Sequence, residues 1–189
     1  PADGDALPEN PLDCSCTKDP EKLRPAAERI KDVGNAYFKK KAYKEALEKY
    51  KKAQSYLKPL LHMVHVEAFG DEEPATWLSG GVRPKDRTDV LRLDFIIKLN
   101  VCQVLIALED WRAAIAIADG VLLELVGKHS KKGHGALPID PLTVKALYRR
   151  ARARVGISSL DGEISQLDEA IDDLRQALIV EPENQDVKL

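Results

Sequence analysis

Small and large apolar residues alternate at helical spacing in three stretches of the chain. The first stretch carries the positions Ile30, Val33, Gly34 and Tyr37, followed by Tyr43, Ala46, Tyr50 and Ala53. Apolar residues three and four positions apart form one face of a helix, so each group predicts an amphipathic helix. The step from Ala46 to Tyr50 recurs as Ala114 with Ala118 and as Ala170 with Leu174. This pattern predicts an all-α fold of three helix pairs.

The expected elements follow from this pattern and from the residues that start and stop helices. We expect helices near residues 25–40, 43–65, 86–108, 111–126, 141–155 and 163–180. Asp140 is expected to cap the fifth helix, with Pro141 in its first turn. The acidic, proline-containing residues 1–22 are expected to form a linker before a helical domain over 23–183. Residues 184–189 are expected to start a capping helix that the chain truncates.

Three segments interrupt the repeated pattern. If each repeat is about 34 residues long, the repeats fall near 27–60, 95–128 and 144–182. Residues 61–94 contain Gly70, Gly80 and Gly81 and lack the small and large apolar positions that mark the repeats. We therefore expect a long insertion there and not a fourth repeat. Further insertions are expected at 129–143, which includes a basic glycine-containing loop, and at 161–167, which has turn chemistry.

Composition and cysteine usage narrow the class of protein. The apolar fraction is 44% and the aromatic fraction 5%, which suits helices packed through small residues. The chain has no apolar run long enough to span a membrane and no signal-type segment, so a cytoplasmic protein is expected. Three cysteines, Cys14, Cys16 and Cys102, favour a reducing compartment without disulfides. The only methionine is Met63, so we expect a fragment or a processed product.

Metal, cofactor and nucleic-acid sites find little support. Cys14 and Cys16 have no companion pair of cysteines and no nearby histidine, which disfavours zinc. His62 and His65 are expected to be polar surface residues. No phosphate-binding loop or catalytic signature is present, so we expect no cofactor. A net charge of −2 with few aromatic residues argues against nucleic acid. The expected state is a monomer.

Polar residues inside the helical pattern are the candidates for a binding site. Lys31 and Asn35 are four residues apart and share one helix face. Asn100 lies in an apolar stretch. The expected fifth helix contains several cations with no acid between them. Lys145, Arg149 and Arg152 share one face, and the remaining cations are Arg150 and Arg154. Unpaired like charges at this spacing cost a few tenths of a kcal/mol each, which a bound anion would offset. The alternative is that these charges are merely solvated and that Asn100 satisfies a buried backbone group.

The same residues carry a family resemblance. Together with the repeated apolar positions, they resemble the dicarboxylate clamp of tetratricopeptide repeat (TPR) co-chaperones. The motif Lys-x-x-x-Asn corresponds to Lys31 and Asn35, Leu-Asn to Leu99-Asn100, and Lys-Ala-Leu-Tyr-Arg-Arg-Ala to residues 145–151. The resemblance implies a right-handed α-solenoid in which the first helices of successive repeats line one groove. It also implies that Lys31, Asn35 and Asn100 hold a peptide's terminal carboxylate.

The remaining roles and the partner are implied by the same resemblance. Lys145 would hold the side chain of a terminal aspartate, Arg149 would reach the peptide further upstream, and Phe38 would offer an apolar wall. The implied ligand is the C-terminal Glu-Glu-Val-Asp tail of the ninety-kilodalton heat-shock chaperone, with that of the seventy-kilodalton one as the alternative. The acidic segment 3–8 and the long insertion after the first repeat are similar to those of immunophilins, in particular forty-kilodalton-type cyclophilins.

Two other functions stay open at this stage. The chain could be the non-catalytic part of a peptidyl-prolyl isomerase whose catalytic domain lies upstream, and no residue in it is expected to catalyse isomerisation. It could also be a TPR scaffold with an unused groove. The scaffold predicts that Lys145→Ala leaves partner binding unchanged.

Overall fold

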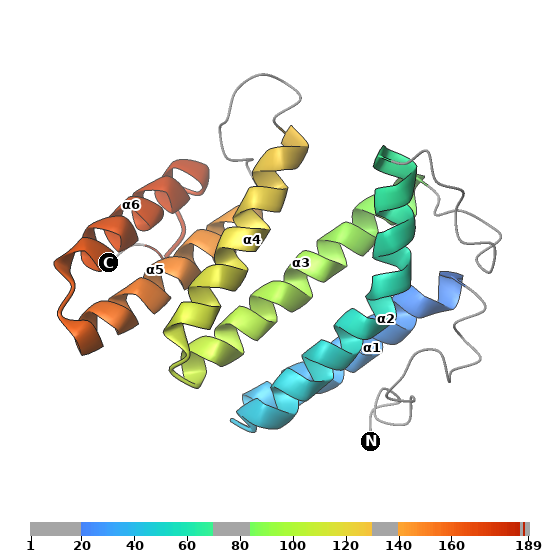
Figure 1. The fold of residues 1–189 in the computed structure, drawn as a ribbon, viewed down its shortest axis with the longest axis horizontal. Helices are drawn as coiled ribbons and strands as arrows, with labels where there is room; N and C mark the ends of the chain where they lie inside the picture. The colour runs from blue at the N-terminus through green and yellow to red at the C-terminus, as the bar shows by residue number, and fades with distance from the viewer. Residues whose placement is uncertain (1–19, 70–83, 130–139, 186, 188–189) are drawn as a thin grey trace. The chain divides into compact units, whose positions relative to one another are not determined.

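The regular structure of the chain is helical. The computed structural model describes residues 20–69, 84–129, 140–185 and 187, and within these residues it contains six helices and no strand. In chain order the helices are α1 (Pro20–Lys39), α2 (Tyr43–Phe69), α3 (Pro84–Ala107), α4 (Trp111–His129), α5 (Pro141–Asp161) and α6 (Ile164–Val180) (Figure 1). This confirms the all-α prediction.

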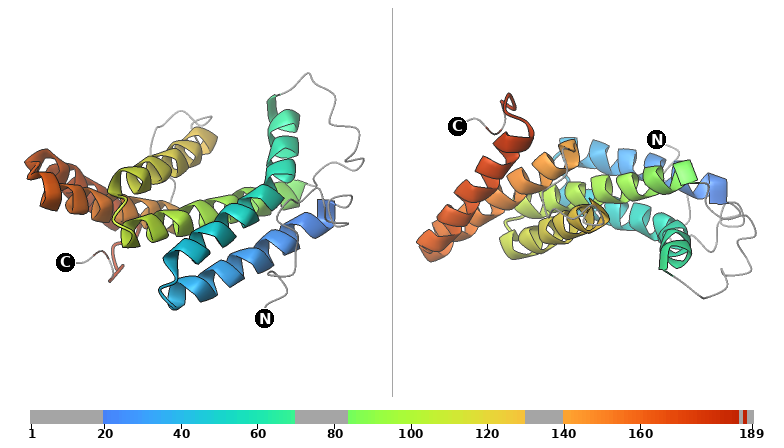
Figure 2. Two further views of the ribbon diagram at one scale, coloured as in Figure 1. Left: turned by 60° about the horizontal axis from the view of Figure 1, so that its bottom comes forward. Right: turned by 90° about the horizontal axis from the view of Figure 1, so that it is seen from above.

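Consecutive helices pair as antiparallel hairpins (Figures 1 and 2). In each hairpin a residue with left-handed backbone stands two positions before the second helix; these residues are Lys41 and Glu109, both with φ 61°, and Gly162 with φ 69°. A left-handed residue is a common way to end a helix. In the first two turns the hydrogen bonds also match, since Ala42 N–H donates to Tyr37 O at 3.0 Å and Asp110 N–H to Leu105 O at 2.9 Å. The chain therefore repeats one local structure.

The chain divides within α3 into two compact units, residues 1–97 and 98–189. In the first unit α1 packs on α2. Ile30, Val33, Ala46 and Ala53 are all buried, as the alternation of small and large residues predicted. Tyr50 is also buried, at 2% exposure, and its ring lies over Gly34, where an added Cβ would come within 2.7 Å of it. A glycine is therefore needed at position 34 for this close approach.

The second unit is built around small side chains. Cys102 and Ile106 of α3, Ala114 and Ala118 of α4, and Ala153 of α5 form one buried cluster. In addition, α5 packs on both α4 and α6. The fifth helix begins as predicted, because the Asp140 carboxylate accepts a hydrogen bond from Leu142 N–H at 2.7 Å and Pro141 occupies the first helical turn.

A glycine on α5 gives a direct test of this packing. A Cβ added to Gly156 would lie 2.5 Å from Cδ2 of the Trp111 ring on α4, whereas one added to Gly120 would meet nothing within 4 Å. Gly156→Ala is expected to lower the free energy of unfolding by about 1–3 kcal/mol through overpacking. Gly120→Ala is expected to raise it by up to about 1 kcal/mol through helix propensity. Urea denaturation of both variants measures the difference, and equal effects would contradict the packing.

Several predicted boundaries differ from the structure. The first helix begins at Pro20, inside the predicted linker, because buried Leu23 extends upstream of Pro25 the packed face that Ala26 and Ala27 continue. The predicted insertion 61–94 is helical at both ends, since it includes the end of α2 and the start of α3. The helix α5 continues beyond Val155 to Asp161, and α4 continues beyond Val126 to His129, the first residue of the predicted insertion 129–143.

The ends of the chain complete the comparison. Beyond Val180, where a capping helix was expected, the described residues 181–185 and 187 include turns and no helix. Residues 1–19, 70–83 and 130–139 lie outside the described part of the chain, as do Cys14 and Cys16. None of the described helices combines the length and the apolar character needed to cross a membrane.

Candidate functional site

In the first unit, Lys31 and Asn35 are half-buried and lie at the edge of the α1 face that packs in the core. Val33 and Gly34, between them in sequence, are buried against α2. The Lys31 side chain is 18% exposed, and its Nζ lies 2.9 Å from Oδ1 of Asp32. The helix thus presents an ammonium group at the edge of the packed face, already close to a carboxylate.

The amide of Asn35 is oriented by a buried tyrosine. Tyr50 Oη donates a hydrogen bond to Asn35 Oδ1 at 2.7 Å. Asn35 Nδ2 in turn donates to Oδ1 of Asp32 at 3.3 Å. Because the tyrosine hydroxyl takes the amide oxygen, the amide nitrogen is directed to Asp32, and Asn35 acts there as a hydrogen-bond donor.

Phe38 lies one turn further along α1 and is half-buried. Its ring packs on Tyr43 of α2, with the ring centroids 5.5 Å apart and the planes tilted by 52°. Offset and tilted aromatic pairs of this kind are favourable beyond their buried area. The contact holds Phe38 at the turn between the two helices with part of its ring exposed.

In the second unit, three further candidates lie on α3 and α5. Asn100 is half-buried between Leu99 and Val101, which are 1% and 6% exposed. Lys145 is exposed and makes no ion pair with any described residue. Arg149 is half-buried, and its positive charge acts on the Cys102 thiol of α3, two residues beyond Asn100. Asn100 and Arg149 therefore belong to neighbouring parts of this unit.

Two other arginines of α5 are structural. Arg150 binds Asp173 of α6 through Nε at 3.0 Å and Nη2 at 2.5 Å, and Nη1 binds Asp119 of α4. Arg154 contacts Asp173 through Nη1 and Glu169 through Nη2 at 2.7 Å. Burial alone would lower the pKa of Arg150, but the hydrogen bonds to Asp173 and Asp119 outweigh it and raise the pKa. The two arginines join α5 to its neighbours.

These contacts correct one sequence expectation. The cations of the fifth helix were expected to lack compensating acids, but α4 and α6 supply acids to Arg150 and Arg154, which a single-helix pattern cannot reveal. Arg152 lies over the Tyr148 ring, 5.9 Å from its centroid, which is a cation–π contact. Arg150 and Arg154 therefore give no support to a bound anion, and Lys145 is the exposed cation of α5 that could meet one.

Cys102 is buried, and the low reactivity of its thiol gives a testable consequence. Its side chain is fully buried, Sγ donates to Ala114 O at 3.3 Å, and burial raises the pKa of the thiol to about 11, with the Arg149 charge opposing part of the rise. The thiolate is the reactive form. In a Cys14→Ser/Cys16→Ser variant, modification of Cys102 at pH 8 is expected to be at least about 100-fold slower in the native state than in urea. Fast native labelling would contradict the burial.

The same shift fixes the direction of a pH effect on stability. The folded state holds the thiol proton to about pH 11, compared with 9.0 for the unshifted group. The contribution of the neutral thiol to the free energy of unfolding is therefore fully present below pH 9 and is lost as the pH rises through 11.

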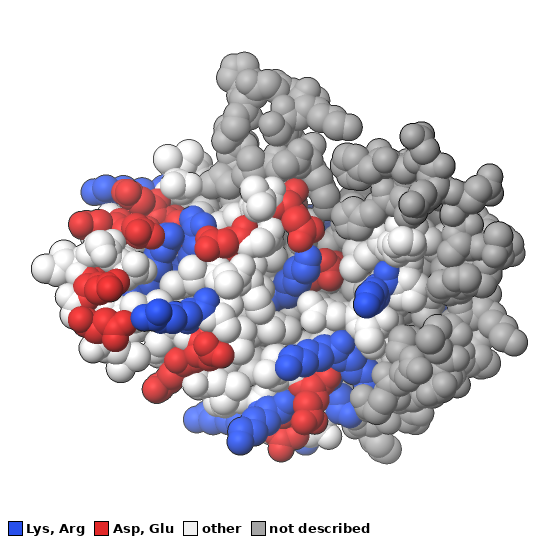
Figure 3. Space-filling model, in the orientation of Figure 1, with Lys and Arg blue, Asp and Glu red and all other residues white. Residues whose placement is uncertain are grey.

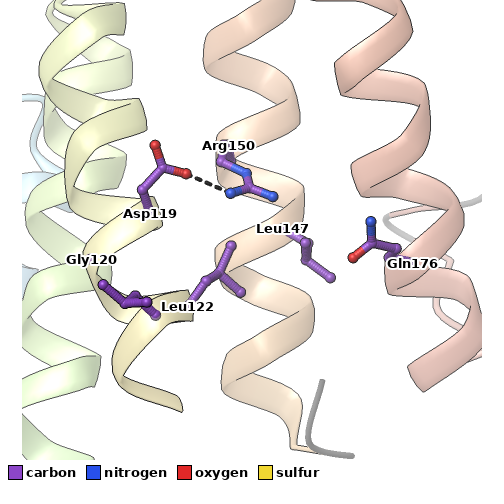
Figure 4. Close-up of a pocket in the computed structure, with 7 residues that line it drawn as sticks. Asp119, Gly120, Leu122, Leu147, Arg150 and Gln176 are labelled. Atoms are coloured by element: carbon purple, nitrogen blue, oxygen red, sulfur yellow. Dashed lines mark hydrogen bonds and ion pairs between the residues drawn. The ribbon is translucent and has the colours of Figure 1, made fainter. Parts of the chain in front are cut away.

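The second unit also contains a shallow, mainly apolar pocket of about 480 Å³ between α4, α5 and α6. Figure 4 shows Arg150 at its edge, paired with Asp119, and Leu147 at the centre opposite Gln176. None of the candidate residues Asn100, Lys145 and Arg149 lines it. On the face drawn in Figure 3, acidic and basic side chains are interspersed, so the described surface there is not a field of one sign.

The candidate residues therefore form two sets, each described within its own unit. Lys31, Asn35 and Phe38 belong to the first unit, and Asn100, Lys145 and Arg149 to the second. Sequence reasoning missed Asp32, although an acid between a lysine and an asparagine on one helix turn is a visible signal. Tyr50 was predicted only to pack between helices, and its hydrogen bond to Asn35 was not foreseen. Among the described residues, no group of histidine, cysteine and acidic side chains could hold a metal ion. Compared with models of known protein families, the sequence matches none.

Proposed function

We propose that the chain is a peptide-binding co-chaperone module, a right-handed array of three TPR helix pairs with a dicarboxylate clamp. Its ligand is the C-terminal Glu-Glu-Val-Asp tail of the ninety-kilodalton heat-shock chaperone, with the seventy-kilodalton chaperone as the second choice. Lys31, Asn35 and Asn100 hold the terminal carboxylate and Lys145 holds the aspartate side chain. Arg149 contacts the upstream peptide, and Phe38 the apolar side chain.

One observation carries the proposal. Lys31 Nζ and Asn35 Nδ2 both lie within hydrogen-bonding reach of a single carboxylate oxygen, Asp32 Oδ1, at 2.9 and 3.3 Å. Two donors from one helix, one of them charged, thus already hold the chemical group that the clamp would bind. The repeated hairpin turns at Lys41 and Glu109 support a repeat architecture.

The distribution of polar and apolar positions supports the same function. On α5, Lys145 is exposed and Arg149 half-buried, while Ala146, Leu147 and Ala151 are buried. The proposed ligand contacts are thus separated from the packing contacts on the same helix. As a binding module of this kind, the chain works in the cytoplasm as a monomer and does not itself catalyse prolyl isomerisation.

Calorimetry with the peptide Met-Glu-Glu-Val-Asp tests the proposal. We expect binding at micromolar concentrations that weakens as salt is raised, because charges are paired across a solvated surface. Amidation of the terminal carboxylate is expected to weaken binding at least about tenfold, since a charge-assisted hydrogen bond contributes roughly 1.5–3 kcal/mol. No binding at several hundred micromolar, or equal binding of the amidated peptide, would sink the proposal.

A further inference from the structure

The carboxylate of Asp32 occupies the position of a ligand in the first unit. Its Oδ1 accepts from both Lys31 Nζ at 2.9 Å and Asn35 Nδ2 at 3.3 Å. These two donors are the first-unit residues assigned above to a peptide carboxylate. A free carboxylate that approaches them meets an oxygen already in place.

The two donors have little freedom to serve another acceptor elsewhere. Lys31 is largely covered, with 18% of its side chain exposed, and the Asn35 amide is held from behind by the buried Tyr50 hydroxyl at 2.7 Å. Asp32 is different, because 65% of its side chain is exposed. The acceptor can therefore swing into solvent while the donors keep their positions.

We propose that Asp32 is an intramolecular competitor for the carboxylate of the peptide ligand, and so a determinant of affinity for anionic ligands. The inference rests on the proposed function. An incoming carboxylate displaces Asp32 from Lys31 and Asn35, and the displaced side chain stays nearby as a like charge. Both effects weaken binding relative to a chain without the acid at position 32.

The size of the effect follows from exposure. Ion pairs with so exposed a carboxylate are weak and are screened by salt, so the competitor is readily displaced. Asp32→Asn is expected to bind Met-Glu-Glu-Val-Asp about two- to fivefold more tightly than the native chain at low salt. Asp32→Ala, which also removes the competing oxygen, is expected to gain at least as much. The gain should shrink as salt is raised.

A matched variant separates competition from net charge. Glu45 is an exposed acid in the first turn of α2, and Glu45→Gln changes the net charge of the first unit by the same amount as Asp32→Asn. Glu45→Gln is expected to leave peptide affinity nearly unchanged. Equal gains in the two variants would replace local competition with a general charge effect and overturn the inference.

The decisive experiment is calorimetry on the native chain and the three variants, with the side-chain amide resonances of Asn35 followed by NMR. We expect these resonances to shift on mutation of Asp32 and to shift again with peptide, at lower peptide concentration in Asp32→Asn. If the native chain binds the peptide and neither Asp32 variant binds it more tightly, this inference alone is overturned. Absence of binding in all four proteins overturns the proposed function and this inference with it. Binding only in the Asp32 variants supports the inference.

Discussion

Asp173→Ala is expected to lower the free energy of unfolding by about 3–5 kcal/mol, the cost of removing one partner from a buried ion-pair network. The Asp173 side chain is 2% exposed and holds Arg150 and Arg154, whose side chains are 17% and 13% exposed. Without the carboxylate, two largely desolvated guanidinium groups lose their shared acceptor. Asp119 and Glu169, about half-exposed, replace only part of that interaction.

The adjacent residue provides the control. Asp172 is 66% exposed, and its one partner among the described residues is Arg175 on the same helix, at 3.2 Å. Asp172→Ala is expected to cost no more than about 0.5 kcal/mol, as for other exposed helix pairs. Urea denaturation of the two variants, with the helical signal as readout, measures both costs. A loss below about 1 kcal/mol for Asp173→Ala would show that the network does not stabilise the second unit.

The helices were predictable from the sequence because their signals are local. The cap at Asp140, the glycine turn at Gly162 and the spacing that places Ala46 and Tyr50 on one helix face each depend on residues within one or two helix turns. The start of α1 was harder to predict. Pro25 suggested the first turn of a helix, but burial of Leu23 outweighs the missing hydrogen bond and extends the helix to Pro20.

The candidate site was predictable only in part, because side-chain partners come from other helices. The helical period separates Arg150 of α5 from the face of Lys145, but it does not reveal the acids of α4 and α6 that bind Arg150. The hydrogen bond from Tyr50 to Asn35 joins positions on two helices whose pairing the apolar pattern predicted, but whose polar contacts it did not. Packing follows from periodicity, whereas pairing of charges requires the tertiary structure.

Arg149→Ala and Lys145→Ala are each expected to weaken binding of Met-Glu-Glu-Val-Asp, by roughly 1.5–3 kcal/mol, or about 10- to 150-fold. The smaller loss is expected for Lys145, because an exposed ammonium is more strongly screened by water and salt. Neither residue belongs to the ion-pair network of Asp173, so both variants are expected to fold. Calorimetry measures the affinity, and thermal unfolding checks the fold.

Arg175→Ala is the matched control for a diffuse electrostatic effect. It removes one exposed cation from the same unit, but from the surface of α6, where Arg175 pairs with Asp172 and with no other residue in the described part of the chain. We expect its peptide affinity to change less than about twofold, as for other screened surface charges. Arg150→Ala is expected instead to destabilise the fold, because it breaks the contacts to Asp173 and Asp119. If Arg175→Ala weakened binding as much as Lys145→Ala, a general positive field would explain the affinity better than a shaped clamp. If Lys145→Ala and Arg149→Ala both bound the peptide normally, the chain would be a scaffold whose α5 cations serve no ligand.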